Sequence, residues 1–282
     1  MRRESSTDAS VRTGTVLRWE LRKLAAQRRT WLGIGAACIG PLVLVAAMSL
    51  HNTALPKDTP FGRYIRDTGM AGPLVLLGFG GMWFLPLLTA MVTGDLFSAE
   101  DHHGTWKTYL TRSTSRNKVF VAKVFAGGLY ALALVVLMTV VSIVSFGLRF
   151  GFHPLTALSG EDISPGRAVL LVAASWLLAL FPLLAFTALA LASSLLSRNG
   201  IAGVLTPVIV SFLMQLLGFL NAGGSTLRHY LLTSQFEAFH GLFHDPRYTA
   251  MVVRVIWVSA VYAVAPIVVS YVVFRRRDIT GG

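Results

Sequence analysis

The sequence predicts an all-α integral membrane protein with six membrane-spanning helices. Of the 282 residues, 54% are hydrophobic and only 13% are charged, whereas an ordinary soluble domain has roughly 25% charged residues. A helix needs about 20 uncharged residues to cross a bilayer. Six gaps between successive charges are each 20 to 30 residues long, so each gap can hold one span.

The apolar runs are rich in Leu, Val and Ala and do not alternate with polar residues, which favours helices over barrel strands. The predicted spans are residues 31–50, 73–94, 119–148, 168–196, 201–220 and 252–274. A tight turn at Ser197–Gly200 would join the fourth and fifth spans. We expect residues 1–15 to form a disordered tail and residues 16–282 to form one transmembrane domain.

The positive charges predict the orientation. Segments on the same side as the N-terminus contain 17 Lys and Arg residues, and segments on the other side contain eight. By the positive-inside rule, both termini lie in the cytoplasm of a multi-pass cell-membrane protein. The net charge of +12 does not indicate nucleic acid as a partner, because these residues form no basic face with aromatic stacking partners; the expected surroundings are the lipid bilayer.

Residues 16–29 have an amphipathic pattern. Val16 and Leu24 can face lipid while Lys23 and Arg29 reach water and headgroups, which predicts an interfacial helix leading into the first span.

A second amphipathic stretch lies between the fifth and sixth spans. Leu232, Phe236, Phe239 and Phe243 recur there at helical spacing. Two interpretations stay open: a helix on the outer leaflet, or a re-entrant element that shapes an outer gate.

The sequence has few residues typical of enzymes or ion-coupled transporters. The cores of the six spans contain no charged residue, which argues against an ion-coupled secondary transporter. There is no zinc motif, nucleophile elbow or phosphate-binding loop. His102 and His103 are adjacent, so on a helix they point about 100° apart and converge poorly on a metal. We expect no catalytic residue, cofactor or metal on this chain.

The connection between the second and third spans is patterned. Apolar residues spaced by three and four positions predict a helix across the cytoplasmic face, with Gly104 able to break it. Glu100, Lys107 and Arg112 supply its polar contacts. The connection and the following span also contain a set of spaced residues: Gly94, Glu100, Gly104, Thr105, Lys107, Leu110, Arg112, Ser115, Arg116 and Lys123.

Together with Glu20, Lys23, Arg29 and Trp31 near the N-terminus, this pattern resembles the ABC-2 type permeases, the membrane subunits of ABC exporters. The resemblance implies a type V exporter-like bundle with an N-terminal elbow helix formed by those four residues. It also implies a cytoplasmic coupling helix seated in a groove of a separate ABC ATP-binding protein. The implied ATPase-coupling residues are Glu100, Gly104, Thr105, Lys107, Arg112 and Arg116.

ATP and Mg²⁺ would then bind to the partner ATPase, and a second permease copy or a related permease would complete the exporter. For Glu100 and Arg116, pairing between helices or with lipid headgroups is an open alternative. For the whole chain, the alternatives are a module of the same fold that serves assembly, sensing or immunity, and an ion-coupled secondary transporter. The cargo cannot be named from apolar spans.

Overall fold

The computed structural model describes residues 12–50, 64–65, 67–102, 104, 115–157, 160–220, 224–244 and 248–276. The elements follow in the order α1 (Thr13–Ala26), α2 (Arg28–Leu50), α3 (Ala71–Thr93), α4 (Ser98–His102), α6 (Arg116–Phe150), β1 (Leu155–Thr156), β2 (Asp162–Ile163), α7 (Pro165–Ser197), α8 (Gly200–Phe219), α9 (Gly224–Arg228), the 3-10 helix η2 (Thr233–Phe243) and α10 (Thr249–Arg276).

Six of these helices, α2, α3, α6, α7, α8 and α10, are long and apolar enough to cross a membrane. This finding confirms the predicted six-span, all-α architecture. The helices begin and end within three residues of the predicted spans. Helix α1 begins at Thr13, so residues 13–15 are helical and do not belong to a disordered tail.

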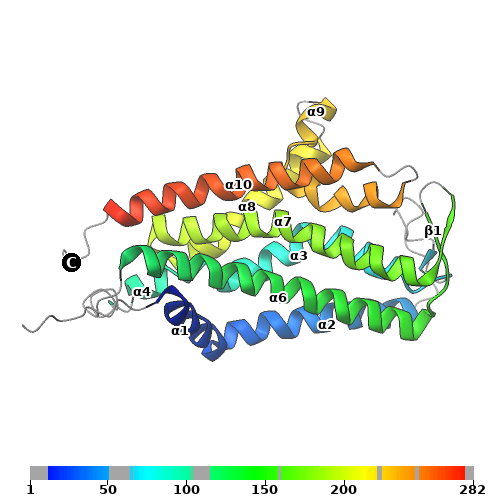
Figure 1. Ribbon diagram of the computed structural model, residues 1–282, viewed down its shortest axis with the longest axis horizontal. Coiled ribbons are helices and arrows are strands. Elements are labelled where there is room, and N and C mark those ends of the chain that lie inside the picture. Colours follow the sequence, from blue (N-terminus) through cyan, green and yellow to red (C-terminus); the bar gives the residue numbers. More distant parts are fainter. Residues whose placement is uncertain are drawn as a thin grey trace, which may run out of the picture.

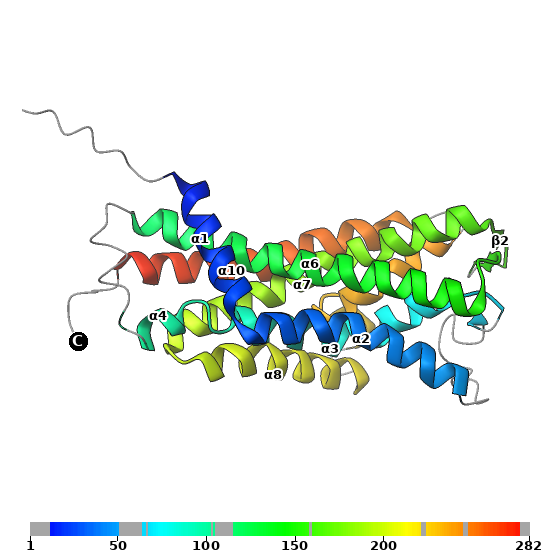
Figure 2. The same ribbon diagram turned by 90° about the horizontal axis from the view of Figure 1, so that it is seen from below.

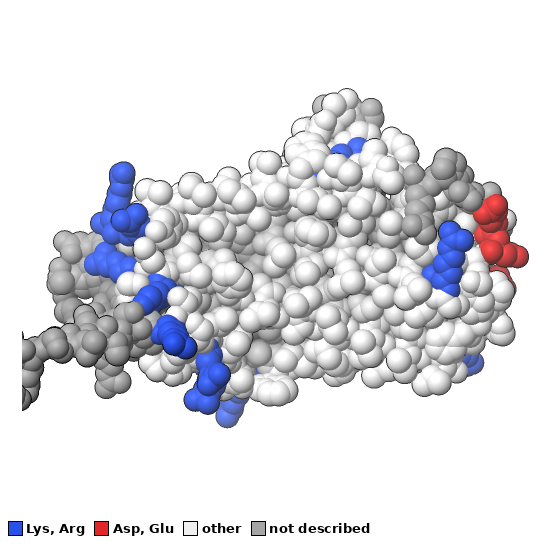
Figure 3. All heavy atoms as spheres, viewed as in Figure 1, with Lys and Arg blue, Asp and Glu red and all other residues white. Residues whose placement is uncertain are grey.

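The six long helices lie side by side in an elongated bundle (Figures 1 and 2). We call the end with α1, α4 and the last turn of α10 the α1 end. The opposite end, which carries the antiparallel pair β1 and β2, is the hairpin end. On the face shown in Figure 3, most Lys and Arg gather at the α1 end, the acidic residues lie at the hairpin end with some Lys or Arg beside them, and the surface between the two ends is almost uncharged. Such an uncharged belt suits the hydrocarbon core of a bilayer.

Helices α3 and α7 form the centre of the bundle. In their apolar stretches, 61% and 56% of the residues are buried inside the protein, against 17% in α2, α8 and α10. The side chains of α2, α8 and α10 therefore supply most of the surface available to lipid or to another membrane protein.

Helices α7 and α8 are joined by the predicted tight turn. Arg198 adopts a left-handed conformation with φ 55°, and the side-chain oxygen of Asn199 accepts a hydrogen bond of 2.9 Å from the backbone nitrogen of Ile201. This cap satisfies one of the free N–H groups at the start of α8. Close by, a Cβ on Gly203 would overlap the carbonyl oxygen of Gly94, so the backbones of α8 and the end of α3 touch directly at the α1 end.

Helix α8 is too short to reach the hairpin end. Its 20 residues span about 30 Å at 1.5 Å per residue, whereas the 33 residues of α7 span about 50 Å. The chain then folds back through α9 and η2 beside α10, and Figure 1 shows α9 projecting from the side of the bundle.

The apolar stripe that was predicted between the last two spans lies in η2 and just before it. Leu232, Phe236, Phe239 and Phe243 are all buried. The ring of Phe236 stacks on Phe186 of α7 with centroids 6.2 Å apart. These four side chains are therefore buried within the protein, in and just before a helix that packs beside α7, α10 and α3. Whether this segment lies at the outer leaflet or is re-entrant stays a prediction. The segment also forms a 3-10 helix, with tighter turns than the α-helix that the spacing suggested.

Candidate functional site

The most buried charges of the described chain lie at the α1 end. The side chains of Lys123 in α6 and Glu20 in α1 are each only 1% exposed. The Nζ atom of Lys123 lies 3.0 Å from Oε2 of Glu20 and 3.2 Å from Oε1 of Glu100. It also donates a hydrogen bond of 2.8 Å to the carbonyl oxygen of Leu96. An ammonium group has three donors, and all three have acceptors here.

A second lysine completes this group. Nζ of Lys23, which is 41% exposed, lies 2.8 Å from Oε1 of Glu100 and 3.8 Å from Oε1 of Glu20. We call Glu20, Lys23, Glu100 and Lys123 the Lys123 cluster. Its two positive and two negative charges balance, which a buried group requires, because an unpaired charge inside a protein or a membrane is costly.

The Lys123 cluster depends on the face that α1 presents to α6. Val16, Glu20 and Leu24 are spaced four residues apart and are the buried residues of α1, so they form one stripe along the helix. The stripe packs against α6. Val16 and Leu24 therefore contact protein, and the expectation that they face lipid is wrong.

Aromatic rings pack beside the Lys123 cluster. The centroid of Phe97 is 5.8 Å from Nζ of Lys123. Phe97 also contacts Phe120 of α6 and Phe274 of α10, with centroids 5.6 Å and 5.8 Å away. These rings exclude water, and the low dielectric strengthens the attraction between the charges. They also link the cluster to the last turns of α10.

A second ion pair holds the start of α2. Nη2 of Arg29 lies 2.7 Å from Oδ2 of Asp95, and Oγ of Ser98 donates a hydrogen bond of 2.9 Å to Oδ1 of Asp95. The backbone N–H of Ser98 donates to Oγ of Ser194 in α7 at 3.1 Å. One short segment, residues 95–100, is therefore fixed to α1, α2, α6 and α7 by polar contacts.

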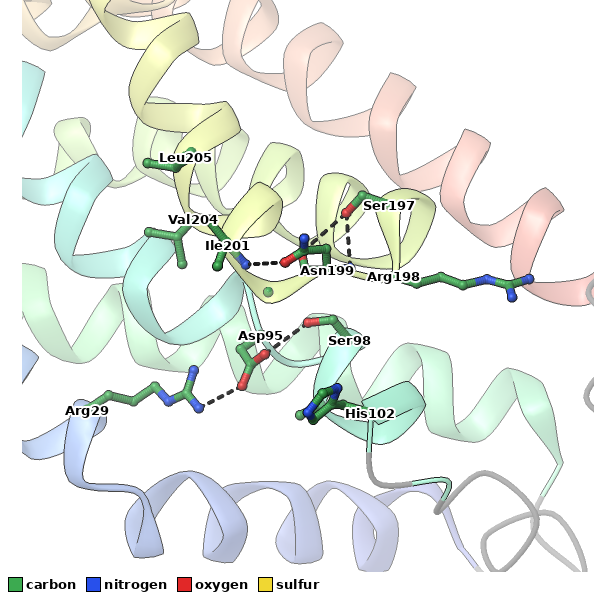
Figure 4. Close-up of a pocket in the computed structure, with 12 residues that line it drawn as sticks. Arg29, Asp95, Ser98, His102, Ser197, Arg198, Asn199, Ile201, Val204 and Leu205 are labelled. Atoms are coloured by element: carbon green, nitrogen blue, oxygen red, sulfur yellow. Dashed lines mark hydrogen bonds and ion pairs between the residues drawn. The ribbon is translucent and has the colours of Figure 1, made fainter. Parts of the chain in front are cut away.

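A cavity of about 900 Å³ opens beside this segment. Figure 4 shows Asp95, Ser98 and His102 on one wall, and the α7–α8 turn with Asn199 on the other. The side chain of Arg198 points away from the cavity (Figure 4). No three His, Cys, Asp or Glu side chains of the described ranges lie close enough together to hold a metal ion.

Comparison with known protein families decides the family. Residues 16–218, more than two thirds of the chain, match the family model described as ABC-2 family transporter protein. The chain belongs to the ABC-2 transporter family. A search of curated protein sequences finds no match. The region shared with the ABC-2 family runs from α1 to the end of α8, and it includes the Lys123 cluster and both walls of the cavity.

The predicted ABC-2 coupling residues differ in their surroundings, and some of them lie outside the described residues. Glu100 lies in α4 with a side chain only 9% exposed, so its carboxylate faces the Lys123 cluster and not the surface. Gly104 is in a left-handed conformation with φ 61° and has open space around it. Thr105, Lys107 and Arg112 lie outside the described residues, and their role in coupling stays a prediction.

Arg116 begins α6, and its Nη1 donates a hydrogen bond of 3.2 Å to the carbonyl oxygen of Arg275. It therefore ties the start of α6 to the end of α10. Both Glu100 and Arg116 therefore make contacts between helices. This agrees with the alternative interpretation, in which these residues pair between helices.

The four residues of the predicted elbow helix also make different contacts. Glu20 and Lys23 belong to the Lys123 cluster, and Arg29 pairs with Asp95. Trp31 is 61% exposed, and its Nε1 donates a hydrogen bond of 2.7 Å to the carbonyl oxygen of Ala25. This bond crosses the break at Gln27 between α1 and α2. An exposed indole at such a position suits a membrane interface, but the position of α1 relative to the bilayer stays a prediction.

Two residues of the site were not among the sequence candidates. Lys123 was named only as the last residue of the family pattern, and Asp95 was not named. One signal was present for Lys123: a lone lysine between Val119, Phe120 and Val124 sits in an apolar helix, where it needs a carboxylate partner.

Proposed function

We propose that this chain is the transmembrane permease subunit of an ATP-driven exporter and works with a separate ABC ATP-binding protein. ATP and Mg²⁺ bind to that partner, which hydrolyses the nucleotide. This chain supplies the membrane path and receives the motion of the ATPase. The membership in the ABC-2 transporter family carries the proposal.

The Lys123 cluster supplies the mechanical part of the proposal. The coupling segment runs from α4 towards Arg116 and would dock on the ATPase. Its first turn is held to α1 by Lys23 and to α6 by Lys123. A push on the coupling segment therefore moves α4, α1 and α6 together. In this account Glu100 is a positioning residue, and the residues after it make the direct contacts.

A second permease copy or a related permease would complete the pathway between the two subunits. The sparsely buried helices α2, α8 and α10 supply the surface on which such a subunit packs. The cargo would pass along that interface.

The α1 end would face the cytoplasm, where the ATPase and its nucleotide are found. The concentration of Lys and Arg at that end (Figure 3) supports this orientation.

Ser115 and Ser164 are exposed residues before α6 and α7, and neither side chain caps its helix. In a background with Cys38→Ala, we expect a membrane-impermeant maleimide to label Ser164→Cys in intact cells. Ser115→Cys should react only after the cells are permeabilised, and the reverse pattern would overturn the orientation.

The proposed partnership is tested by purifying the tagged full-length chain from its own host in mild detergent. We expect an ABC ATP-binding protein to co-purify in equal stoichiometry, as identified by mass spectrometry. A chain that purifies without one, from cells that produce such proteins, would favour a non-transporting module of the same fold. Transport that needs an ion gradient and no ATPase would favour a secondary transporter.

A further inference from the structure

Two small cavities lie where the chain folds back between α8 and α10. One, of about 240 Å³, is lined by Arg228, Glu237, His240 and Arg254 among others. The second, of about 250 Å³, has a lining that is more polar than apolar, in which Met82, Met214 and Phe219 are the apolar side chains. Arg228, Ser234 and Glu237 line both, so the two cavities meet at the same three side chains.

Among the described residues that line the first cavity, the charges do not balance. Nη2 of Arg228 lies 3.5 Å from Oε2 of Glu237, and both side chains are substantially exposed, which makes this a weak pair. Arg254 forms no ion pair within the described part of the chain. The described lining of this cavity thus contains two guanidinium groups and one carboxylate.

Arg254 lies in the second turn of α10 (Thr249–Arg276), a helix long and apolar enough to cross a membrane. An arginine in such a helix is costly unless something neutralises it, and ionisable residues at such positions typically mark binding sites. Its neighbours on η2 include only one carboxylate, that of Glu237. The geometry therefore leaves room for one more negative charge beside Arg254.

One uncharged hydrogen-bond donor, the amide of Gln215, also lacks a partner at these cavities. The Nε2 atom of Gln215, on the wall of the second cavity, is buried and has no hydrogen-bond partner. Nδ1 of His240 lies 2.8 Å from the carbonyl oxygen of Glu237; because a carbonyl only accepts, Nδ1 carries the hydrogen. Burial lowers the pKa of the His240 ring, against the opposing effect of Glu237. A neutral ring leaves the two guanidinium groups and the carboxylate of Glu237 as the charged groups of the described residues that line the cavity.

We propose that the two cavities form one binding site for an anionic amphiphile. Arg254 and Arg228 hold its phosphate or carboxylate head, and its apolar tail lies along Met82, Met214 and Phe219. The same chemistry is shared by anionic lipids of the bilayer and by amphiphilic molecules that the chain could export. The charged residues of the site, Arg228, Glu237 and Arg254, lie beyond residue 218, where the match to the family ends, and the site does not depend on an ATPase or on export.

The test uses the full-length chain in nanodiscs of phosphatidylcholine, without nucleotide or partner. Calorimetric titration compares dodecyl phosphate, dodecylphosphocholine and inorganic phosphate, after subtraction of empty nanodiscs. We expect saturable binding of dodecyl phosphate at one molecule per chain. Dodecylphosphocholine lacks the net charge and inorganic phosphate lacks the tail, so both should bind at least tenfold more weakly.

Three variants connect this binding to the named residues. Arg254→Gln removes a charge-assisted contact and should weaken dodecyl phosphate binding by about tenfold to a hundredfold. Arg167→Gln, which removes the same charge from an exposed position at the start of α7, should leave the affinity unchanged. Glu237→Gln frees Arg228 and removes the competing carboxylate, so it should strengthen binding several-fold, a gain that misfolding cannot imitate.

Adding phosphatidylglycerol to the nanodiscs separates the two sources of ligand. Competition with dodecyl phosphate would identify the bilayer lipid as an occupant, whereas undiminished binding would assign the site to single-chain amphiphiles. The proposal is overturned if no saturable binding occurs, if dodecylphosphocholine binds equally well, or if Arg254→Gln and Glu237→Gln both bind like the wild type.

Discussion

Replacing Lys123 by methionine is expected to lower the free energy of unfolding by about 3–5 kcal/mol, because it leaves two buried carboxylates with one lysine. The side chains of Lys123 and Glu20 are 1% exposed, so water cannot take the place of the lost ammonium. Methionine has a similar length and fills the same space. The measurement is equilibrium unfolding of the purified chain in mixed micelles with increasing dodecyl sulfate.

Two further variants distinguish the loss of the buried ion pairs from the general effect of removing a positive charge. Arg22→Gln removes one positive charge from an exposed position on α1 and should change stability by less than about 0.5 kcal/mol. Adding Glu20→Gln to Lys123→Met restores one lysine and one glutamate, so the double variant should be more stable than Lys123→Met alone. Simple addition of two losses would contradict a balanced cluster.

Glu100→Gln should produce the largest functional loss, because it releases α4 from both lysines of the cluster. If each charge-assisted contact contributes about 1.5–3 kcal/mol, the complex with the ATP-binding protein should weaken by about tenfold to a hundredfold. The chain itself should still insert into the membrane, since Glu100 lies outside the six long helices. The measurement is the affinity of the purified ATP-binding protein for the permease in nanodiscs.

The charge balance distinguishes a positioning residue from a direct contact. Adding Lys23→Gln to Glu100→Gln leaves Glu20 with Lys123, which is again a neutral pair. If Glu100 only positions α4, this double variant should recover part of the lost affinity. No recovery would mean that Glu100 touches the ATPase itself. Glu161→Gln, an exposed position at the hairpin end, is the matched control and should bind normally.

The spans could be predicted closely because a bilayer imposes one simple condition on the sequence. Every charge inside the hydrocarbon is costly, so the gaps between charges mark the helices. Ser197, Arg198, Asn199 and Gly200 interrupt a long apolar region at the place where α7 turns into α8. The break at Gln27 between α1 and α2 has no comparable signal.

The Lys123 cluster could not be predicted from spacing, because its members are far apart in the chain. Lys123 is 103 residues from Glu20, and Lys23 is 77 residues from Glu100. Only the packing of α1 against α6 brings them together. The sequence indicated which residues belong to the family pattern, but not that Glu100 points inward.

The neighbours of the stripe in η2 could not be predicted, for a different reason. Periodic apolar residues predict that one side of a segment avoids water, and the burial of Phe236 and Phe239 agrees with that. Lipid tails are as apolar as a protein core, so the pattern cannot distinguish lipid from protein as the neighbour. The short length of α8, which leaves room for the chain to fold back, became visible only in the structure.

ATP turnover by the ATP-binding protein, measured in liposomes with and without this chain, tests the central claim most directly. The account predicts that the complex with wild-type permease hydrolyses ATP faster than the ATPase alone, and that Glu100→Gln removes most of this difference while Glu161→Gln keeps it. Equal turnover in the presence and absence of the wild-type chain would contradict the claim that it couples to an ATPase.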